Sequence, residues 1–96
     1  MKQKLQNQII YITGASAGIG LSTAGLCLKE GATVVITGRN EERLKEAELI
    51  LGKISSNVVA HLLDVSIESD LIESLNNIYK KFGRIDGLIN NAPSIH

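Results

Sequence analysis

Glycines at positions 14, 18 and 20 form the segment of this sequence with the clearest chemical potential. The segment follows a short β-branched and aromatic run and precedes a stretch with helical periodicity. A glycine-rich turn between a strand and a helix lets backbone N–H groups reach a phosphate at the positive end of the helix. Gly14 would permit a tight turn, Gly18 would leave room for a pyrophosphate, and Gly20 would let the helix pack closely on the strand. We therefore predict a site for a dinucleotide pyrophosphate.

The spacing of these glycines narrows the kinds of phosphate site that the loop can form. It reads G-x-x-x-G-x-G rather than G-x-G-x-x-G, and Leu21 stands near the end of the loop, where a P-loop requires lysine. A kinase or nucleoside-triphosphatase site is therefore disfavoured. The alternative is that the three glycines only make a flexible turn between a strand and a helix.

A few other residues have side chains of chemically active types. His61 lies on a predicted strand without a second ligand or carboxylate partner at suitable spacing, so we expect a hydrogen-bonded core residue. Cys27 should pack as a small apolar group, and Asp86 should hold the turn before a strand. Asn90 lies at the carboxyl end of a parallel strand, where ligands bind in such sheets. It either contacts a ribose or, together with Asn91, ties neighbouring loops to each other.

Four strands alternating with three helices would position these residues. β-Branched runs predict strands at 9–12, 33–37, 58–63 and 86–90, and apolar periodicity predicts a helix after each of the first three. This alternation implies right-handed crossovers onto a parallel sheet. We expect one domain over residues 1–96 with a partial doubly wound, Rossmann-type α/β fold and the strand order 3-2-1-4.

Each predicted helix has an expected buried face and expected end signals. Asn40 and Ser66 are candidate N-caps of the second and third helices, and Gly31 and Gly83 are candidate left-handed residues after the first and third. The expected buried residues are Ile19, Thr23, Leu26 and Cys27 in the first helix, Ala47, Ile50, Leu51 and Ile54 in the second, and Leu71, Leu75, Ile78 and Phe82 in the third.

The composition excludes several classes of protein. Lys plus Arg and Asp plus Glu both total 10, which leaves no net charge to attract a polyanion, so nucleic-acid binding is not expected. The single cysteine cannot form an internal disulfide, and no paired Cys or His spacing suits a metal. The apolar run at 9–12 is far too short for a signal sequence or a membrane span. We expect a cytoplasmic protein without a membrane partner.

Three motifs together resemble the short-chain dehydrogenase/reductase family. Thr13-Gly14-x-x-x-Gly18-Ile19-Gly20 is similar to its T-G-x-x-x-G-x-G signature, and Asn90-Asn91-Ala92 is similar to its N-N-A-G motif, with Pro93 in place of the glycine. Asp64-Val65 matches the acidic residue that binds the adenine ring and its neighbour, which contributes a backbone contact. The residues that the resemblance places at the cofactor are Gly14, Ser16, Ala17, Gly18, Ile19, Gly20, Asp64, Val65, Asn90 and Ala92.

The choice between NAD and NADP depends on the end of the second strand. An NAD site places a carboxylate for the ribose 2′-hydroxyl about 20 residues beyond the glycines. Gly38 occupies that place, and Arg39 follows with a planar set of donors suited to a 2′-phosphate. Ser16 and Asn40 could add hydrogen bonds, so we expect NADP to be preferred. The alternative is that Arg39 is an exposed charge paired with Glu41 or Glu42.

The family transfers hydride between NADP(H) and an alcohol or carbonyl substrate through a Ser and a Y-x-x-x-K pair. Neither Tyr11 nor Tyr79 has a lysine four positions later, so no catalytic residue is assigned. We expect the N-terminal part of a homo-oligomeric oxidoreductase, inactive alone and marginally stable or self-associating because its fourth strand is an open edge. The alternatives are a non-catalytic nucleotide-binding module and a non-functional truncated product.

Overall fold

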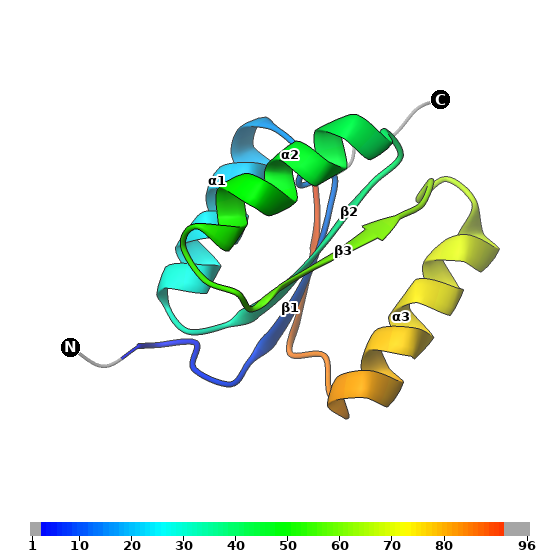
Figure 1. The fold of residues 1–96 in the computed structure, drawn as a ribbon. Helices are drawn as coiled ribbons and strands as arrows, with labels where there is room; N and C mark the ends of the chain where they lie inside the picture. The colour runs from blue at the N-terminus through cyan, green and yellow to red at the C-terminus, as the bar shows by residue number, and fades with distance from the viewer. Residues whose placement is uncertain (1–2, 92–96) are drawn as a thin grey trace.

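A four-stranded parallel sheet with helices on both faces forms the protein (Figure 1). This computed structural model describes residues 3–91. The strand order is β3-β2-β1-β4, so the predicted partial doubly wound α/β fold and its order are confirmed. The elements are β1 Ile9–Thr13, α1 Gly18–Lys29, β2 Thr33–Gly38, α2 Glu41–Gly52, β3 Val58–Leu62, α3 Glu68–Phe82 and β4 Gly87–Asn90.

The central strand is β1, and all five of its residues are buried. It pairs in parallel with β2 on one side and with β4 on the other, so that Tyr11 lies opposite Val35 and Leu88. A strand covered on both faces needs apolar side chains at successive positions, and Ile9-Ile10-Tyr11-Ile12 supplies them. Because all four strands run the same way, their carboxyl ends meet at one edge of the sheet.

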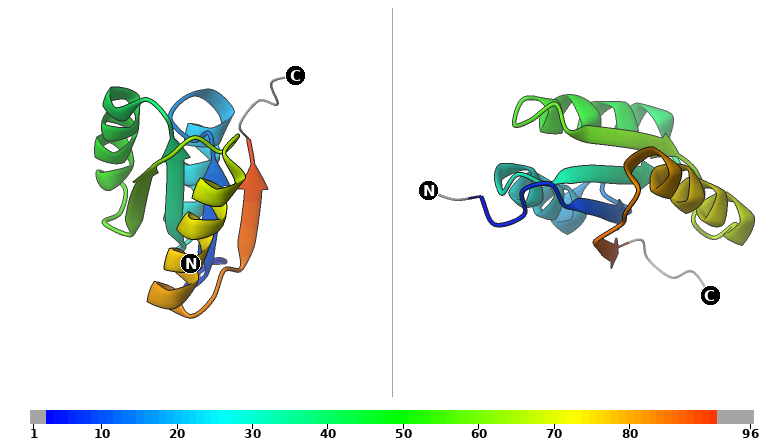
Figure 2. Two further views of the ribbon diagram at one scale, coloured as in Figure 1. Left: turned by 90° about the vertical axis from the view of Figure 1, so that its right-hand side faces the viewer. Right: turned by 90° about the horizontal axis from the view of Figure 1, so that it is seen from below.

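Two apolar clusters hold the layers together. α1 and α2 cover one face of the sheet and α3 covers the other (Figures 1 and 2). Alternate residues of β1 point to opposite faces: Ile10 and Ile12 join the cluster with α1 and α2, whereas Ile9 and Tyr11 join the cluster with Ile78 of α3. Burial of each such side chain contributes about 1.5–3 kcal/mol.

The predicted buried faces of α1 and α2 were partly wrong. In α1 the buried side is formed by small residues with Cys27 and Leu28, while Ile19 and Leu26 are 78% and 63% exposed and Thr23 is only partly buried. A Cβ at Gly25 would lie 3.3 Å from Ile54 Cδ1, so the small residue brings α1 close to the end of α2.

In α2 the buried residues are Leu44, Ala47 and Leu51, whereas Ile50 is exposed and Ile54 lies beyond the helix, also exposed. α1 is rotated away from the face predicted from its large apolar side chains, because the small residues Ala24 and Gly25 face the core.

The helix ends follow the sequence signals with one exception. Asn40 caps α2 by accepting a hydrogen bond from the Arg43 amide at 3.0 Å, and Gly31 and Gly83 have positive φ angles of 92° and 78°. The prediction that Ser66 caps α3 was wrong. Ile67 is the N-cap, and its apolar side chain can make no cap bond, while the Ser66 hydroxyl donates to Asp64 at 2.7 Å.

β4 lies at an open edge of the sheet, to the side of α3 (Figure 2, left). Leu88 faces the same side of the sheet as Tyr11 but is 58% exposed, and Ile89 on the other side is 36% exposed. Neither apolar side chain is fully covered by the described elements. Within residues 3–91, no helix is both long and apolar enough to cross a membrane.

Candidate functional site

The loops after the four strands gather the predicted site residues at one edge of the sheet. The loop after β1 carries 14–17, the loop after β2 begins at Arg39, the loop after β3 carries Asp64 and Val65, and Asn90 ends β4. Parallel strands bring their carboxyl ends to this edge, and ligands of doubly wound sheets bind there. Ala92 lies outside the described residues.

The glycine-rich loop has the backbone that its glycines were expected to allow. Gly14 and Gly18 have positive φ angles of 68° and 60°, a conformation that other residues adopt at a cost. A Cβ at Gly18 would meet no atom within 4 Å, so open space lies beside it. A Cβ at Gly20 would lie 2.7 Å from the Gly14 carbonyl oxygen and 2.6 Å from Asn91 Nδ2. Gly20 therefore allows α1 to pack closely against the loop.

The first turn of α1 has backbone amides with no side-chain partner at its cap. Its N-cap is Ala17, which has no side-chain oxygen, and its first turn contains no acidic residue. The first turn of α2, by contrast, is capped by Asn40 and contains Glu41 and Glu42. Free amides and the positive end of the helix dipole favour an anion at the start of α1. Ala17 and Ile19 are exposed there.

The end of β2 lies beside the glycine-rich loop. A Cβ at Gly38 would be 3.8 Å from the Ser16 Cβ, so Ser16 and the residues after β2 are neighbours. Arg39 is exposed, and neither ion pair found within residues 3–91 involves it. Glu41 instead pairs with Lys45 at 3.2 Å. The Arg39 guanidinium is therefore available at the surface, next to a position without a carboxylate.

Asp64 lies in the loop after β3 and is held by Ser66. Its Oδ1 accepts hydrogen bonds from the Ser66 hydroxyl at 2.7 Å and from the Ser66 backbone amide at 2.9 Å. These bonds, with a smaller effect from the positive charge of Arg39, lower the pKa of Asp64. Asp64 is therefore an ionised acceptor at neutral pH, and Val65 beside it is partly buried.

Asn90 and Asn91 tie the end of β4 to the end of β1. The Thr13 hydroxyl donates to Asn90 Oδ1 at 2.8 Å. The Asn91 backbone amide donates to Thr13 Oγ1 at 3.0 Å, and the Asn91 side-chain Nδ2 donates to the Gly14 carbonyl oxygen at 3.3 Å. The structural role that we considered for these asparagines is thus present. The amide nitrogen of the exposed Asn90 has no partner in the described residues, so it remains able to donate elsewhere.

Sequence reasoning missed a buried group of polar side chains under α3. Tyr11 Oη lies 2.7 Å from Ser74 Oγ, and the same Ser74 oxygen lies 2.6 Å from His61 Nδ1. His61 is indeed hydrogen-bonded, as expected, but it is only partly buried because β3 is an edge strand. No sequence spacing links Ser74 to Tyr11, since the contact depends on how α3 packs on the sheet.

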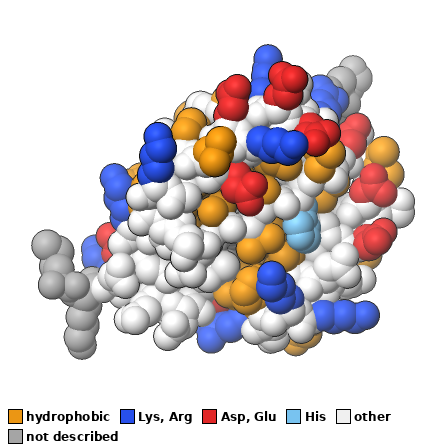
Figure 3. Space-filling view, viewed as in Figure 1, with side chains coloured by type: hydrophobic (Ala, Val, Ile, Leu, Met, Phe, Trp, Pro, Cys, Tyr) orange, Lys and Arg blue, Asp and Glu red, His pale blue; other side chains and the backbone are white. Residues whose placement is uncertain are grey.

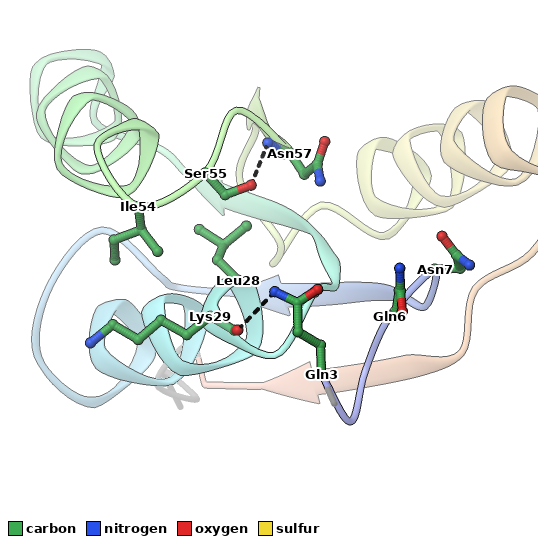
Figure 4. A pocket seen from close by; sticks show the side chains of 9 residues that line it. Gln3, Gln6, Asn7, Leu28, Lys29, Ile54, Ser55 and Asn57 are labelled. Carbon is green, nitrogen blue, oxygen red and sulfur yellow. Dashed lines mark hydrogen bonds between the residues drawn. The ribbon is translucent and has the colours of Figure 1, made fainter. Parts of the chain in front are cut away.

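An open polar pocket lies near the amino ends of the strands, at the opposite end of the sheet from the candidate site (Figure 4). It has a volume of about 460 Å³, and Gln3 in it donates to the Lys29 carbonyl at 3.3 Å. Its lining comes from segments before β1, β2 and β3 and from the ends of α1 and α2. It therefore shares no residue with the candidate site.

Known proteins of one family match nearly the whole length of this chain. The sequence pattern of the short chain dehydrogenases matches residues 8–95. The uncharacterized oxidoreductase YxnA of Bacillus subtilis is 42% identical over 90 residues, which are 94% of this chain and 25% of that protein. The 3-oxoacyl-[acyl-carrier-protein] reductase FabG of Thermotoga maritima is 38% identical over 93 residues, 93% of this chain and 36% of that protein.

Solved structures give the same result for the fold. A short chain dehydrogenase from Bacillus anthracis superposes with a TM-score of 0.86 at 41% identity, over 94% of this chain and 36% of that one. An NAD+-bound xylitol dehydrogenase superposes with a TM-score of 0.89 at 31% identity, over 95% and 35%. The chain spans a quarter to just over a third of the lengths of these proteins.

Proposed function

Because the chain belongs to the short-chain dehydrogenase family, we propose that it forms the cofactor-binding part of an oxidoreductase that uses NADP(H) in preference to NAD(H). The bound dinucleotide would supply or accept the hydride. The chain's own residues would bind and orient it, while the groups that act on an alcohol or carbonyl substrate would come from sequence outside these 96 residues. Neither tyrosine here has a lysine four positions later.

The described residues fit a dinucleotide at this edge of the sheet. Open space beside Gly18 and the uncapped amides of α1 suit a pyrophosphate. Asp64 and the backbone at Val65 lie at the end of β3, on the side where an adenine would extend past β2. Asn90 ends β4 on the other side of β1, where the second ribose would lie.

One observation carries the preference for NADP: at the end of β2, next to Ser16, Gly38 stands where an NAD site has a carboxylate, and Arg39 follows it directly. A carboxylate at position 38 would accept hydrogen bonds from a 2′-hydroxyl and repel a 2′-phosphate, but Gly38 has none. The unpaired Arg39 guanidinium and the Ser16 hydroxyl offer donors to a phosphate instead. Asn40 caps α2 with its side-chain oxygen Oδ1, which leaves its side-chain nitrogen Nδ2 as a further donor.

The proposal is tested by fluorescence titration of the chain with NADPH and with NADH. We expect tighter binding of NADPH, and we expect Arg39→Glu to weaken NADPH binding about 10- to 100-fold through the loss of a charge-assisted contact. NADH binding should change little. Lys53→Glu makes the same change of net charge at an exposed position on the opposite edge and should affect neither.

Equal losses for the two cofactors in Arg39→Glu would refute the preference for NADP. If the chain binds neither NADPH nor NADH, the proposed cofactor site is refuted. Tight NADPH binding by a gene product that ends at His96 would instead support a non-catalytic nucleotide-binding module.

A further inference from the structure

Three side chains from three elements form one hydrogen-bonded chain under α3. Tyr11 comes from the central strand β1, His61 from the edge strand β3, and Ser74 from the second turn of α3. The Ser74 oxygen lies 2.7 Å from Tyr11 Oη and 2.6 Å from His61 Nδ1. Tyr11 has no exposed surface and Ser74 is 5% exposed, whereas the imidazole is in partial contact with solvent. The histidine side chain is visible beside hydrophobic groups on the molecular surface (Figure 3).

The direction of hydrogen-bond donation along this chain depends on the charge of His61. With a neutral imidazole protonated at Nε2, the Tyr11 hydroxyl donates to Ser74 and the Ser74 hydroxyl donates to Nδ1, so every buried hydrogen has an acceptor. Burial raises the pKa of Tyr11, which therefore keeps its hydrogen. The Tyr11 hydroxyl has no second partner in the described part of the chain.

Protonation of His61 reverses that direction. Both ring nitrogens then carry hydrogens, so Nδ1 donates to Ser74, and the two contacts of the chain must hold three hydrogens, those of Nδ1, Ser74 and Tyr11. One buried hydroxyl hydrogen is left without an acceptor within the chain: that of Tyr11 where Ser74 donates to Tyr11, or that of Ser74 where Tyr11 donates to Ser74. An unpaired buried donor is costly enough to lower a folding equilibrium constant roughly tenfold or more.

The packing of α3 on the sheet depends strongly on the hydrogen bonds of Ser74. Of its 15 residues only Ser74 and Ile78 are buried, and the apolar residues Leu71, Leu75 and Phe82 are partly exposed. The charged group of α3 that acts on the imidazole is Lys81, whose ammonium also lies 5.4 Å from the centre of the Phe82 ring. From the sheet, His61 faces Tyr11 of β1 through Ser74 and pairs with Thr37 of β2.

We propose that the Tyr11–Ser74–His61 chain is a pH-sensitive latch, which holds α3 on the sheet while His61 is neutral and loosens it when the imidazole is protonated. The latch is independent of the proposed cofactor site, since none of its three residues belongs to that site. Ser74 is the central residue of the latch, because its hydroxyl oxygen makes both hydrogen bonds of the chain.

The direction of the pH effect follows from the environment of His61. Burial, and then the positive charge of Lys81, lower the pKa of His61 below its ordinary value of about 6.5. The unfolded chain therefore takes up a proton at a higher pH than the folded chain does. The latch contributes its full stability above about pH 6.5, and that stability is lost as the pH falls from there toward the lowered pKa.

The test is urea unfolding of the chain, followed by circular dichroism at about pH 8 and about pH 5, on either side of the ordinary histidine pKa. The variant His61→Gln has an amide oxygen that can accept from Ser74 at both values. We expect the folding equilibrium constant of the natural chain to fall roughly tenfold more than that of His61→Gln between the two values. Ser74→Ala removes the hydroxyl that joins Tyr11 to His61, so protonation of His61 no longer changes a hydrogen bond of the chain and most of this difference should disappear.

The control and the direct measurement separate the latch from simple burial of a histidine. Ser69→Ala makes the same change at an exposed serine of α3, and it should keep the full pH dependence of the natural chain. NMR of the imidazole of His61 in the natural chain should show the Nε2–H tautomer at about pH 8.

Equal pH dependence of the natural chain and His61→Gln would overturn the proposal. Undiminished dependence in Ser74→Ala would do the same, because burial of His61 alone would then explain it. If the variants do not fold, a His61 pKa at or above about 6.5 in the natural chain, or an Nδ1–H tautomer, overturns it as well. A natural chain without a cooperative transition at about pH 8 also overturns it, because the latch requires a docked α3.

Discussion

At the scale of single residues, Gly18 and Gly83 share a backbone conformation but differ in their surroundings. Their φ angles are 60° and 78°, and a Cβ at either position would meet no atom within 4 Å. Gly18 opens the first turn of α1 at the candidate site, whereas Gly83 only ends α3. The two positions therefore allow the cost of the backbone conformation to be separated from the loss of space for a ligand.

We predict that Gly18→Ala and Gly83→Ala each lower the free energy of unfolding by about 1 kcal/mol, because alanine is disfavoured at positive φ. Gly18→Ala alone should also weaken dinucleotide binding, since its methyl group enters the space beside the loop. Urea unfolding and NADPH titration of both variants measure the two effects. Similar NADPH affinities for the two variants would show that the open space beside Gly18 is not used by the cofactor.

The residue scale also shows what sequence reasoning can and cannot reach at the candidate site. The turn at Gly14, the open space at Gly18, the missing carboxylate at Gly38 and the cap at Asn40 are local, and the sequence indicated each of them. The proximity of Ser16 to Gly38 joins two segments 22 positions apart, and the bonds of Asn91 to Thr13 and Gly14 span more than 75. Such contacts depend on the sheet register and are not encoded in any one motif.

At the scale of elements, the three helices were predicted with different success for a physical reason. α3 has a regular stripe of large apolar residues, and Leu71, Leu75, Ile78 and Phe82 do face the sheet. α1 packs through small residues, because Gly20 meets the loop and Gly25 meets Ile54. Close approach of backbones thus replaces large side chains, and a pattern based on side-chain size assigns the wrong face.

A pair of substitutions compares the observed cap with the one that was wrongly expected. Asn40→Ala should lower the free energy of unfolding by about 1 kcal/mol, because the Arg43 amide loses its partner. Ser66→Ala should cost less, since no amide of α3 bonds to Ser66 and only its local bond to the exposed Asp64 turn is lost. Thermal or urea unfolding checks both. A larger loss in Ser66→Ala than in Asn40→Ala would contradict the observed caps.

At the scale of the whole molecule, the sheet is unequally covered. α1, α2 and α3 bury the residues of β1 and most of those of β2, but β4 has Leu88 at 58% exposure beside an unpaired edge. Open, apolar strand edges pair with other strands unless charge or covering elements prevent it. The parallel sheet was predictable from the alternation of strands with helices, whereas the degree to which each strand is covered depends on packing.

We predict that the 96-residue chain self-associates through β4 and that Leu88→Lys reduces this association, because a charge on an edge strand opposes pairing. Leu49→Lys places the same charge at a 70% exposed leucine on α2 and should leave association unchanged. Sedimentation velocity over a range of concentrations measures the effect. A stable monomer at all concentrations, or equal effects of the two variants, would contradict the prediction.

The central place of β1 has a consequence for synthesis of the chain on the ribosome. β1 ends at Thr13, but its neighbours β2 and β4 begin only at Thr33 and Gly87. At about 5–20 residues per second, one edge of this apolar strand stays unpaired for roughly 4–15 s, long enough for a chaperone to bind it. The glycine-rich loop is among the first segments to be made, yet its bond from Asn91 to Gly14 must wait until translation has passed residue 91.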